Sequence, residues 1–247
     1  AIMTDRKETK GTSGRSYRGD AGLTSKVKKK RGLTASSRRW IERQINDPYV
    51  AEARSKGYRS RAALKLEQID DKHKLLKTGQ TVLDLGSAPG GWLQVTSNRI
   101  GLDEGKGKLA GIDLLDVDPI TNALILKGDI NDDEKLAELI AYIGGKADWV
   151  ISDMAADTTG HRPTDHLRTT ALLEMALDTA IRVLVPGGGF LSKCFQGGAE
   201  IELLTLMRQA FEQVKHIKPD ASRSESVEIY VLCTGFKGVP EHYLFAD

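Results

Sequence analysis

The chain has 247 residues, of which 40% are hydrophobic and 28% charged, a composition that supports a packed core in one large domain. Its two cysteines, Cys194 and Cys233, lie outside any Cys-x-x-Cys spacing, which argues against a disulfide framework or a structural zinc site and favours the cytoplasm. We expect no membrane span and no signal peptide, because no apolar run is long enough to cross a bilayer and none follows the first basic residues.

The first residues of the chain carry an excess of positive charge. Residues 1–43 hold 13 Lys or Arg and 4 Asp or Glu, a balance of +9, so the remaining residues carry −7. Residues 1–36 are rich in Gly, Ser, Thr, Lys and Arg and poor in large apolar side chains, so we expect a disordered basic arm. The Lys26–Arg31 block favours an arm that contacts RNA phosphates, with a solvating tail as the alternative.

The folded domain is expected to span residues 37–247 and to begin with helices within residues 37–78. Amphipathic patterns predict a short helix around Trp40–Ile45 and a second helix over Tyr49–Lys56. The second helix is expected to end at Gly57, a residue type that commonly stops helices.

A third helix is expected to follow, with Ser60 as its N-terminal cap. Ala62, Leu66 and Ile69 recur at nearly helical spacing and are predicted to face inward. Lys65 would then lie near this buried stripe. It is either a lysine that extends its amine to solvent or a functional group.

A glycine turn between a strand and a helix is the central feature of the chain. The predicted strand Thr81–Leu85 runs through Gly86 and Gly90 into a helix over Trp92–Ile100. The turn lacks the Lys-Ser/Thr of a phosphate-binding loop and the second glycine of a dinucleotide fingerprint. It therefore favours a nucleoside ligand without a pyrophosphate, such as S-adenosylmethionine (SAM), over an ordinary strand–helix turn of another enzyme.

Strands and helices alternate through the rest of the chain. Further strands are predicted at Lys108–Ile112, Ala123–Leu126, Asp148–Ser152, Phe190–Lys193, Val214–Ile217 and Glu228–Cys233. Further helices are predicted at Glu134–Ile143, Arg168–Leu184 and Glu200–Phe211, with a turn at Pro186–Gly189. This order indicates an α/β protein with a mostly parallel, doubly wound, seven-stranded sheet and helices on both faces. The last two strands lack a long helix between them, so we expect an antiparallel hairpin at one edge.

Four polar side chains follow predicted strands, at the edge of the sheet where ligands bind. Asp113 is placed to accept hydrogen bonds from ribose hydroxyls, although Asp also caps helices. Asp129 would accept from an adenine amino group or form a turn, and Asp153 would lie beside the methionine end of the cofactor. Lys193, after a buried strand, needs a carboxylate, a substrate or a lowered pKa. Asp153 could supply the carboxylate, and a purely structural ion pair is the alternative.

Taken together, these residues resemble the RlmE/FtsJ (RrmJ) family of SAM-dependent ribosomal RNA 2′-O-ribose methyltransferases, from about Ser37 to Lys237. The motifs that carry the resemblance are Ser60–Leu66, Asp84–Trp92, Ser152–Ala155, Lys193–Gly197, and Lys218–Arg223 followed by Glu228–Tyr230. One departure is Ala156-Asp157, where the family usually has Pro-Asn.

The resemblance implies roles for individual residues. The family's catalytic set falls on Lys65, Asp153, Lys193 and Glu228. Its cofactor contacts fall on Gly90, Trp92, Asp113, Asp129 and Asp153. The family resemblance further implies a Rossmann-like methyltransferase fold with SAM as cofactor, no metal, and N-terminal helices that face RNA.

The implied reaction transfers the SAM methyl group to the 2′-hydroxyl of a uridine in 23S ribosomal RNA. The substrate would be the assembled 50S subunit in the cytoplasm, the enzyme a monomer, and Lys193 the proton acceptor. One alternative is the same chemistry on a messenger RNA cap or transfer RNA. Another is a non-catalytic ribosome-assembly factor that only binds RNA. An NAD-dependent dehydrogenase is disfavoured by the missing glycine.

Overall fold

The computed structural model describes residues 41–42, 45–157, 159–196 and 201–240, and the chain divides into two compact units, residues 1–47 and 48–247. The expected arm of residues 1–36 lies outside the described residues. Of the helix expected around Trp40–Ile45, residues 41, 42 and 45 are described, and they are helical.

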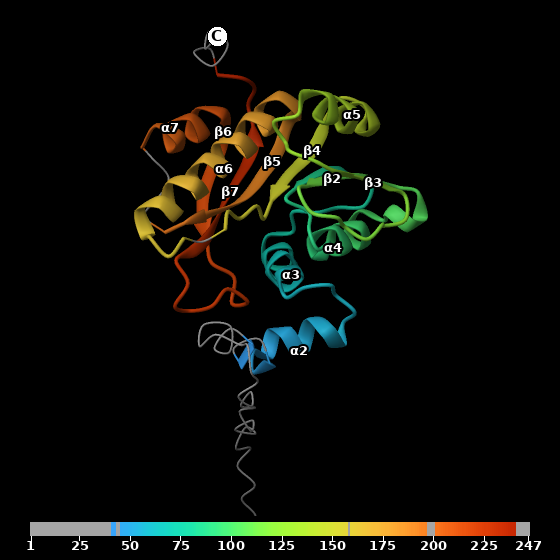
Figure 1. Cartoon of the computed structure of the whole chain (residues 1–247). Coiled ribbons are helices and arrows are strands. Elements are labelled where there is room, and N and C mark those ends of the chain that lie inside the picture. The colour runs from blue at the N-terminus through green and yellow to red at the C-terminus, as the bar shows by residue number, and fades with distance from the viewer. Residues whose placement is uncertain (1–40, 43–44, 158, 197–200, 241–247) are drawn as a thin grey trace, which may run out of the picture. The chain divides into compact units, whose positions relative to one another are not determined.

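The second unit is built on a seven-stranded sheet with the strand order β3-β2-β1-β4-β5-β7-β6 (Figure 1). The strands are β1 Thr81–Leu85, β2 Lys108–Asp113, β3 Ala123–Lys127, β4 Ala147–Ser152, β5 Leu184–Phe195, β6 Phe211–Ile217 and β7 Glu228–Phe236. The first five strands pair in parallel, whereas β7 runs antiparallel to both β5 and β6. The predicted mostly parallel sheet with an antiparallel edge hairpin is therefore confirmed.

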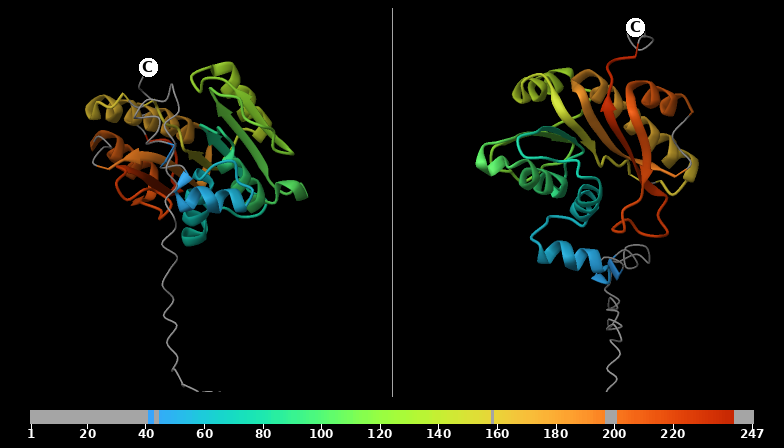
Figure 2. Two further views of the ribbon diagram at one scale, coloured as in Figure 1. Left: turned by 60° about the horizontal axis from the view of Figure 1, so that its bottom comes forward. Right: turned by 180° about the vertical axis from the view of Figure 1, so that it is seen from behind.

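Helices cover both faces of this sheet (Figure 2). They are α2 Pro48–Ser55, α3 Ala62–His73, α4 Gly91–Ile100, α5 Asp133–Ile143, α6 Arg162–Val183 and α7 Ile201–Ala210, with a short 3₁₀ helix at Leu102–Glu104. Successive strand residues point to opposite faces, so Val82 packs with α3 and α4 while Leu83 packs with α5, α6 and α7. Both faces of the sheet are thus buried, as in doubly wound α/β proteins, and the fold prediction is confirmed.

The predicted cap of the third helix is wrong. The N-cap position of α3 is Arg61, which makes no side-chain capping hydrogen bond. Ser60 instead lies against α4, where its Oγ would be 2.5 Å from a Cβ placed on Gly91. Close packing between α3 and the start of α4 therefore determines the position of this side chain, in place of the local capping interaction.

The region between α6 and β5 also differs from expectation. Helix α6 begins at Arg162, six residues earlier than predicted, and Pro163 near its start is compatible with a helix N-terminus. The sequence did not indicate these first turns because they carry no apolar repeat. The expected turn Pro186–Gly189 lies within β5, where the pairing with β4 shifts register. The indole ring of Trp149 covers Gly189 so closely that a Cβ there would clash at 2.3 Å.

Candidate active site

The sheet order brings three of the predicted site residues together at one edge. Asp153 directly follows β4, and Lys193 follows Ser192, which is in register with the last residue of β4. Glu228 is the first residue of β7 and pairs with Phe195 of β5. Since β7 is antiparallel to β5, its beginning lies beside the end of β5.

These side chains form an ion-pair cluster. The Lys193 Nζ lies 2.9 Å from Asp153 Oδ1 and donates to the Asp153 backbone oxygen at 2.8 Å. It also lies 3.7 Å from Glu228 Oε2. Lys65 reaches the same site from α3 and pairs with Glu228 Oε1. We call Lys65, Asp153, Lys193 and Glu228 the lysine–carboxylate cluster. All four side chains are largely buried, and that of Lys193 is 8% exposed.

Tyr230 belongs to the same site, although it was not among the predicted site residues. Its hydroxyl donates to Asp153 Oδ1 at 2.7 Å and lies 3.4 Å from Glu228 Oε1. Its ring centroid lies 5.7 Å from that of Trp92 and 5.8 Å from Lys65 Nζ. The available signal was the strand period of two, which places Tyr230 on the same face of β7 as Glu228.

The cluster is arranged to keep Lys193 and Asp153 charged. Burial by itself lowers the pKa of the Lys193 ammonium, but Asp153 and Glu228 raise it by more, so the pKa lies above its usual value. Burial likewise raises the pKa of Asp153, and Lys193 and Lys65 overcome this effect and lower it. In the free protein Lys193 is therefore an ammonium and Asp153 a carboxylate.

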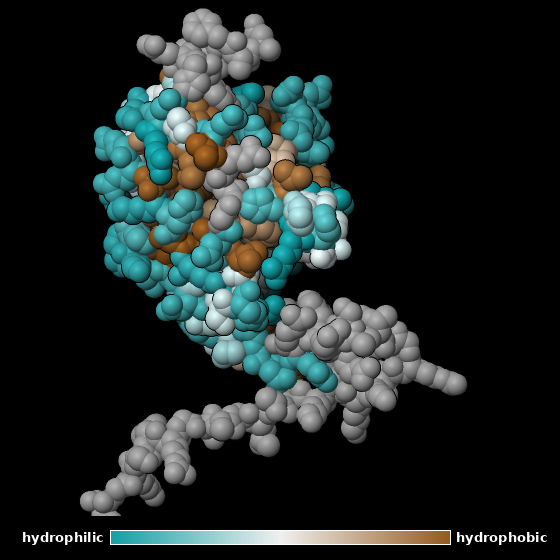
Figure 3. Space-filling model, turned by 90° about the vertical axis from the view of Figure 1, so that its left-hand side faces the viewer, coloured by the Kyte–Doolittle hydropathy of each residue, from teal (hydrophilic) through white to brown (hydrophobic). Residues whose placement is uncertain are grey.

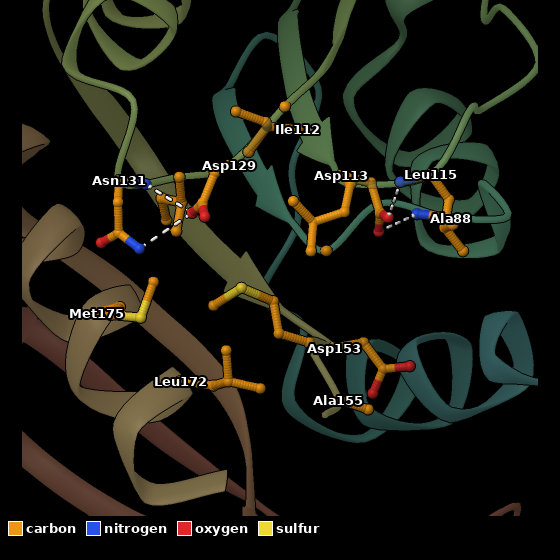
Figure 4. Close-up of a pocket in the computed structure, with 15 residues that line it drawn as sticks. Ala88, Ile112, Asp113, Leu115, Asp129, Asn131, Asp153, Ala155, Leu172 and Met175 are labelled. Carbon is orange, nitrogen blue, oxygen red and sulfur yellow. Dashed lines mark hydrogen bonds between the residues drawn. The ribbon is translucent and has the colours of Figure 1, made fainter. Parts of the chain in front are cut away.

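A cavity of about 430 Å³ opens beside the cluster, at the ends of β1 to β4 (Figure 4). We call it the first cavity. Asp113 accepts hydrogen bonds from the backbone N–H groups of Ala88 and Leu115, both at 2.8 Å. Asp129 Oδ1 accepts from the backbone and side-chain nitrogens of Asn131, both at 3.0 Å. Each carboxylate is thus held in place and retains lone pairs for a further donor.

The first cavity has the size and chemistry that a nucleoside requires. Its volume falls within the range of ordinary small-molecule sites. Carboxylates at the ends of β2 and β3 can accept from hydroxyl and amino groups, while Leu115, Leu172 and Met175 provide apolar walls. The turn at Gly86 packs against Met154, and a Cβ at Gly86 would lie 2.5 Å from the Met154 Cγ. The residues therefore fit the adenosine part of SAM.

Three of the five predicted cofactor contacts line the first cavity, and two do not. Asp113, Asp129 and Asp153 line the first cavity, whereas Gly90 and Trp92 are not among its lining residues. Trp92 is buried in the core, and its Nε1 donates to the Ala62 carbonyl at 2.8 Å. Gly90 lies against the Arg59 side chain and has a φ of +104°, a backbone conformation that favours glycine.

A second cavity of about 650 Å³ lies on the other side of the cluster. It includes Lys193 and Glu228 and shares Ala155 with the first cavity. Its remaining walls come from the start of α6, the end of β5 and the segment before β7. The lysine–carboxylate cluster therefore stands where two cavities meet.

Large apolar side chains are exposed at the rims of both cavities. Leu114 and Leu115, which are 66% and 67% exposed, line the first cavity, and Val227, 49% exposed, lines the second. On the face shown in Figure 3, hydrophobic patches are scattered over a mainly hydrophilic surface. Exposed apolar groups at a cavity mouth are typical of ligand contacts.

Among the described residues, no group of three or more His, Cys, Asp or Glu is arranged to hold a metal ion. No helix in the same residues combines the length and apolar character that a membrane crossing needs.

Comparison with known proteins identifies the family. A family model described as FtsJ-like methyltransferase matches residues 58–236. The chain is 54% identical over 228 residues to "Ribosomal RNA large subunit methyltransferase E" of Brucella ovis, covering 92% of this chain and 95% of that protein. The protein of the same name from Brucella canis is equally similar. A crystal structure described as a ribosomal RNA methyltransferase from Plasmodium falciparum is 32% identical with a TM-score of 0.63, covering 73% of this chain and all of that one.

A second structural neighbour, a hemolysin-like protein from Streptococcus thermophilus, shows only that the fold is shared, with 15% identity, a TM-score of 0.50, and coverage of 75% of this chain and 70% of that one. The family model spans most of the chain, and the Brucella relatives match more than half of the aligned positions. The protein therefore belongs to the FtsJ-like methyltransferase family, as the sequence motifs predicted.

Proposed function

We propose that this protein transfers the methyl group of SAM to the 2′-hydroxyl of a uridine in large-subunit ribosomal RNA, on the assembled 50S subunit. The observation that carries the proposal is the position of Lys193, held between Asp153 and Glu228 at the junction of two cavities. The names of the Brucella relatives and of the Plasmodium falciparum protein support ribosomal RNA as the substrate.

The first cavity would hold the cofactor. SAM supplies a methyl group that its sulfonium already activates, so this chemistry needs no metal. Asp113 would accept hydrogen bonds from the ribose hydroxyls, and Asp129 from the adenine amino group. Asp153 would offset the positive charge near the methionine end. Gly90 and Trp92 would act from outside the cavity wall, by shaping the turn and supporting Tyr230.

Lys193 would accept the proton of the 2′-hydroxyl. A ribose hydroxyl is a weak nucleophile and must lose this proton as it attacks, and a positioned base contributes about 10²- to 10⁴-fold. The amine must first be neutral. A cation bound in the first cavity competes for Asp153 and repels the ammonium, and both effects lower the pKa of Lys193. After the transfer, Asp153 and Glu228 stabilise the ammonium that forms.

Lys65 and Glu228 would hold the ribose and orient Lys193. The ion pair between them fixes the Glu228 carboxylate, whose other oxygen lies 3.7 Å from Lys193 Nζ. Alignment of two reactants supplies on the order of 7–11 kcal/mol in well-oriented systems. Buried ion pairs are costly to assemble, so a protein that only bound RNA would gain little from this cluster.

The decisive experiment is mass-spectrometric mapping of ribose methylation in ribosomal RNA from cells that lack this protein. We expect the loss of one 2′-O-methyluridine from the large-subunit RNA. The wild-type protein should restore this modification, and Lys193→Ala should not. An unchanged map of ribosomal RNA, or a loss confined to transfer RNA or messenger RNA caps, would contradict the proposed substrate.

The basic residues 1–36 would strengthen RNA binding through phosphate contacts. Deleting them should weaken binding to 50S subunits and flatten its dependence on salt, because fewer counterions are released from the RNA. The measurement is the dissociation constant for 50S subunits at several salt concentrations. If the salt slope is unchanged, the arm does not contribute to the binding surface.

A further inference from the structure

The walls of the second cavity come from three segments that are distant in sequence. Helix α6 contributes Arg162 and His166, the end of β5 contributes Phe195, and the segment before β7 contributes Val227. The backbone N–H of Gln196 donates to the Val227 carbonyl at 2.7 Å and ties two of these segments together. The cavity is therefore a defined pocket beside the lysine–carboxylate cluster.

The pocket lies beside the groups that would act on the RNA ribose that accepts the methyl group. Lys193 and Glu228 form one side of it, and Asp153 lines the first cavity instead. A ribose whose hydroxyl approaches Lys193 has its base attached on the neighbouring carbon of the ring. Because the first cavity suits the cofactor nucleoside, the second cavity is the space that remains for this base.

Aromatic rings in the pocket wall are suited to a flat base. The rings of His166 and Phe195 have centroids 6.4 Å apart and planes inclined at 51°. The phenyl ring of Phe195 is half-buried, at the end of a strand that fixes its backbone. Proteins that select single RNA nucleotides commonly stack an unstacked base on such rings.

Arg162 adds a cation at the mouth of the same pocket. It is exposed, and its guanidinium makes no hydrogen bond or ion pair with another residue in the described part of the chain. The nearby carboxylate of Asp165 is already engaged by Thr159 and Gly160. The guanidinium is thus available to a phosphate, which it can bind through two parallel hydrogen bonds.

We propose that the second cavity receives the base of the nucleotide to be methylated, stacked on Phe195, with an adjoining phosphate bound by Arg162. The proposal rests on the proposed function, because it assumes that the acceptor is an RNA ribose. It assigns to Phe195 a direct contact with the substrate and to Arg162 a contact with the RNA backbone. The nucleotide must turn out of any base stack to reach the pocket.

The test compares variants at Phe195 in tritiated-methyl transfer to 50S subunits from cells that lack this protein. Phe195→Ala should reduce kcat/KM for 50S subunits by about 10- to 100-fold, the effect of losing one base–ring stack. Phe195→Tyr should recover most of the activity, whereas Phe195→Leu, which keeps apolar volume without a ring, should not. SAM affinity, measured by calorimetry, should be unchanged in all three variants.

A variant at Arg162 tests the phosphate contact, and a variant at Tyr142 serves as the control. Arg162→Ala should raise KM for 50S subunits and reduce the salt slope by about one, with little change in kcat. Tyr142→Ala removes a half-exposed ring on α5, outside the residues that line either cavity, and should behave like the wild type.

The outcomes separate this inference from the proposed function. If the wild-type protein methylates no RNA ribose, the proposed function itself is wrong. If the wild type is active and Phe195→Ala keeps its kcat/KM, the base site is wrong. Equal activities of Phe195→Leu and Phe195→Tyr would overturn it as well, and this comparison remains valid if the alanine variant fails to fold.

Discussion

The two cavities beside the lysine–carboxylate cluster are built from different halves of the sheet. The first lies at the ends of the parallel strands β1 to β4 and presents carboxylates anchored by backbone N–H groups. The second lies against β5, the antiparallel β7 and the start of α6, and presents aromatic rings and a guanidinium.

The difference shows that the direction of a strand determines whether its first or its last residues lie at the edge of the sheet where the cavities are. Parallel strands all end at the same edge. Asp113 at the end of β2, Asp129 two residues after β3 and Asp153 directly after β4 therefore lie at this edge. The antiparallel β7 instead begins at this edge. Its first residue, Glu228, therefore reaches the cluster from the opposite chain direction.

The largest effect is expected where the two cavities meet. Lys193→Ala should reduce methyl transfer to 50S subunits by about 10²- to 10⁴-fold, because it removes the proposed base. SAM should still bind, since the loss of the ammonium leaves Asp153 free to attract a cation. Single-turnover methyl transfer and SAM calorimetry measure the two effects separately.

Lys106→Ala is the matched control for this substitution, because it removes a lysine from an exposed ion pair with Glu104. Near-normal transfer by Lys193→Ala would refute its assignment as proton acceptor and would leave the junction without a base.

The wild-type rate should also rise with pH below the pKa of Lys193, since the neutral amine is the active form.

A smaller effect is expected for a variant in the first cavity, which should change SAM binding and leave the KM for 50S subunits nearly unchanged. Asp113→Ala should weaken SAM binding by about 10- to 100-fold, the effect of losing hydrogen bonds to a charged group. The KM for 50S subunits should change little, because Asp113 lines only the first cavity. Calorimetry with SAM and steady-state kinetics with 50S subunits provide the comparison.

Asp116→Ala is the control for the Asp113 variant. Asp116 follows Asp113 by three residues, is 84% exposed on its side chain, and does not line the cavity. An equal rise in both the SAM dissociation constant and the KM for 50S subunits would show that the two cavities do not act independently.

The smallest effect concerns a carboxyl group that is buried in the sheet and lines neither cavity. Asp84 in β1 is fully buried, and neither carboxylate oxygen has a hydrogen-bond partner among the described residues. Burial, with the charges of Asp153 and Asp113, raises its pKa well above the usual value. Between the unfolded and folded pKa values the folded protein holds a proton that the unfolded chain has released, so the free energy of unfolding falls as pH rises.

Asp84→Asn removes this titration and should raise Tm at neutral pH by a few degrees, corresponding to about 1–3 kcal/mol. The gain should shrink as pH falls toward 4, because the unfolded group also begins to take up a proton near its usual pKa of 3.8. Thermal unfolding from pH 4 to 8 tests this, with the exposed Asp116→Asn as control. A lower Tm for Asp84→Asn at neutral pH would mean that Asp84 is ionised and paired.

Much of the fold was predictable because its signals are local. The apolar runs ending in Asp or Gly identified the parallel strands, and their order placed Asp153 and Lys193 on adjacent strands. The strand period of two also placed Tyr230 on the face of Glu228, but its hydroxyl contact with Asp153 depends on the pairing of β7 with β5.

Other features depend on packing between distant segments. Ser60 resembled a helix cap but lies against Gly91, and Trp92 follows the glycine turn but is buried against Tyr230. The second cavity combines side chains from α6, β5 and the segment before β7, so no short stretch of the chain indicates it.

Residue order alone was enough to predict the class of fold, the seven strands and two candidate lysines, because apolar periodicity and turn residues act over a few positions. Packing between distant segments of the chain determined the remaining features of the site. Lys65 and Glu228 are 163 positions apart, and their ion pair forms only when α3 packs beside β7. The direction of β7 then determines which carboxylate reaches Lys193, since reversing a strand exchanges the ends that meet at one edge.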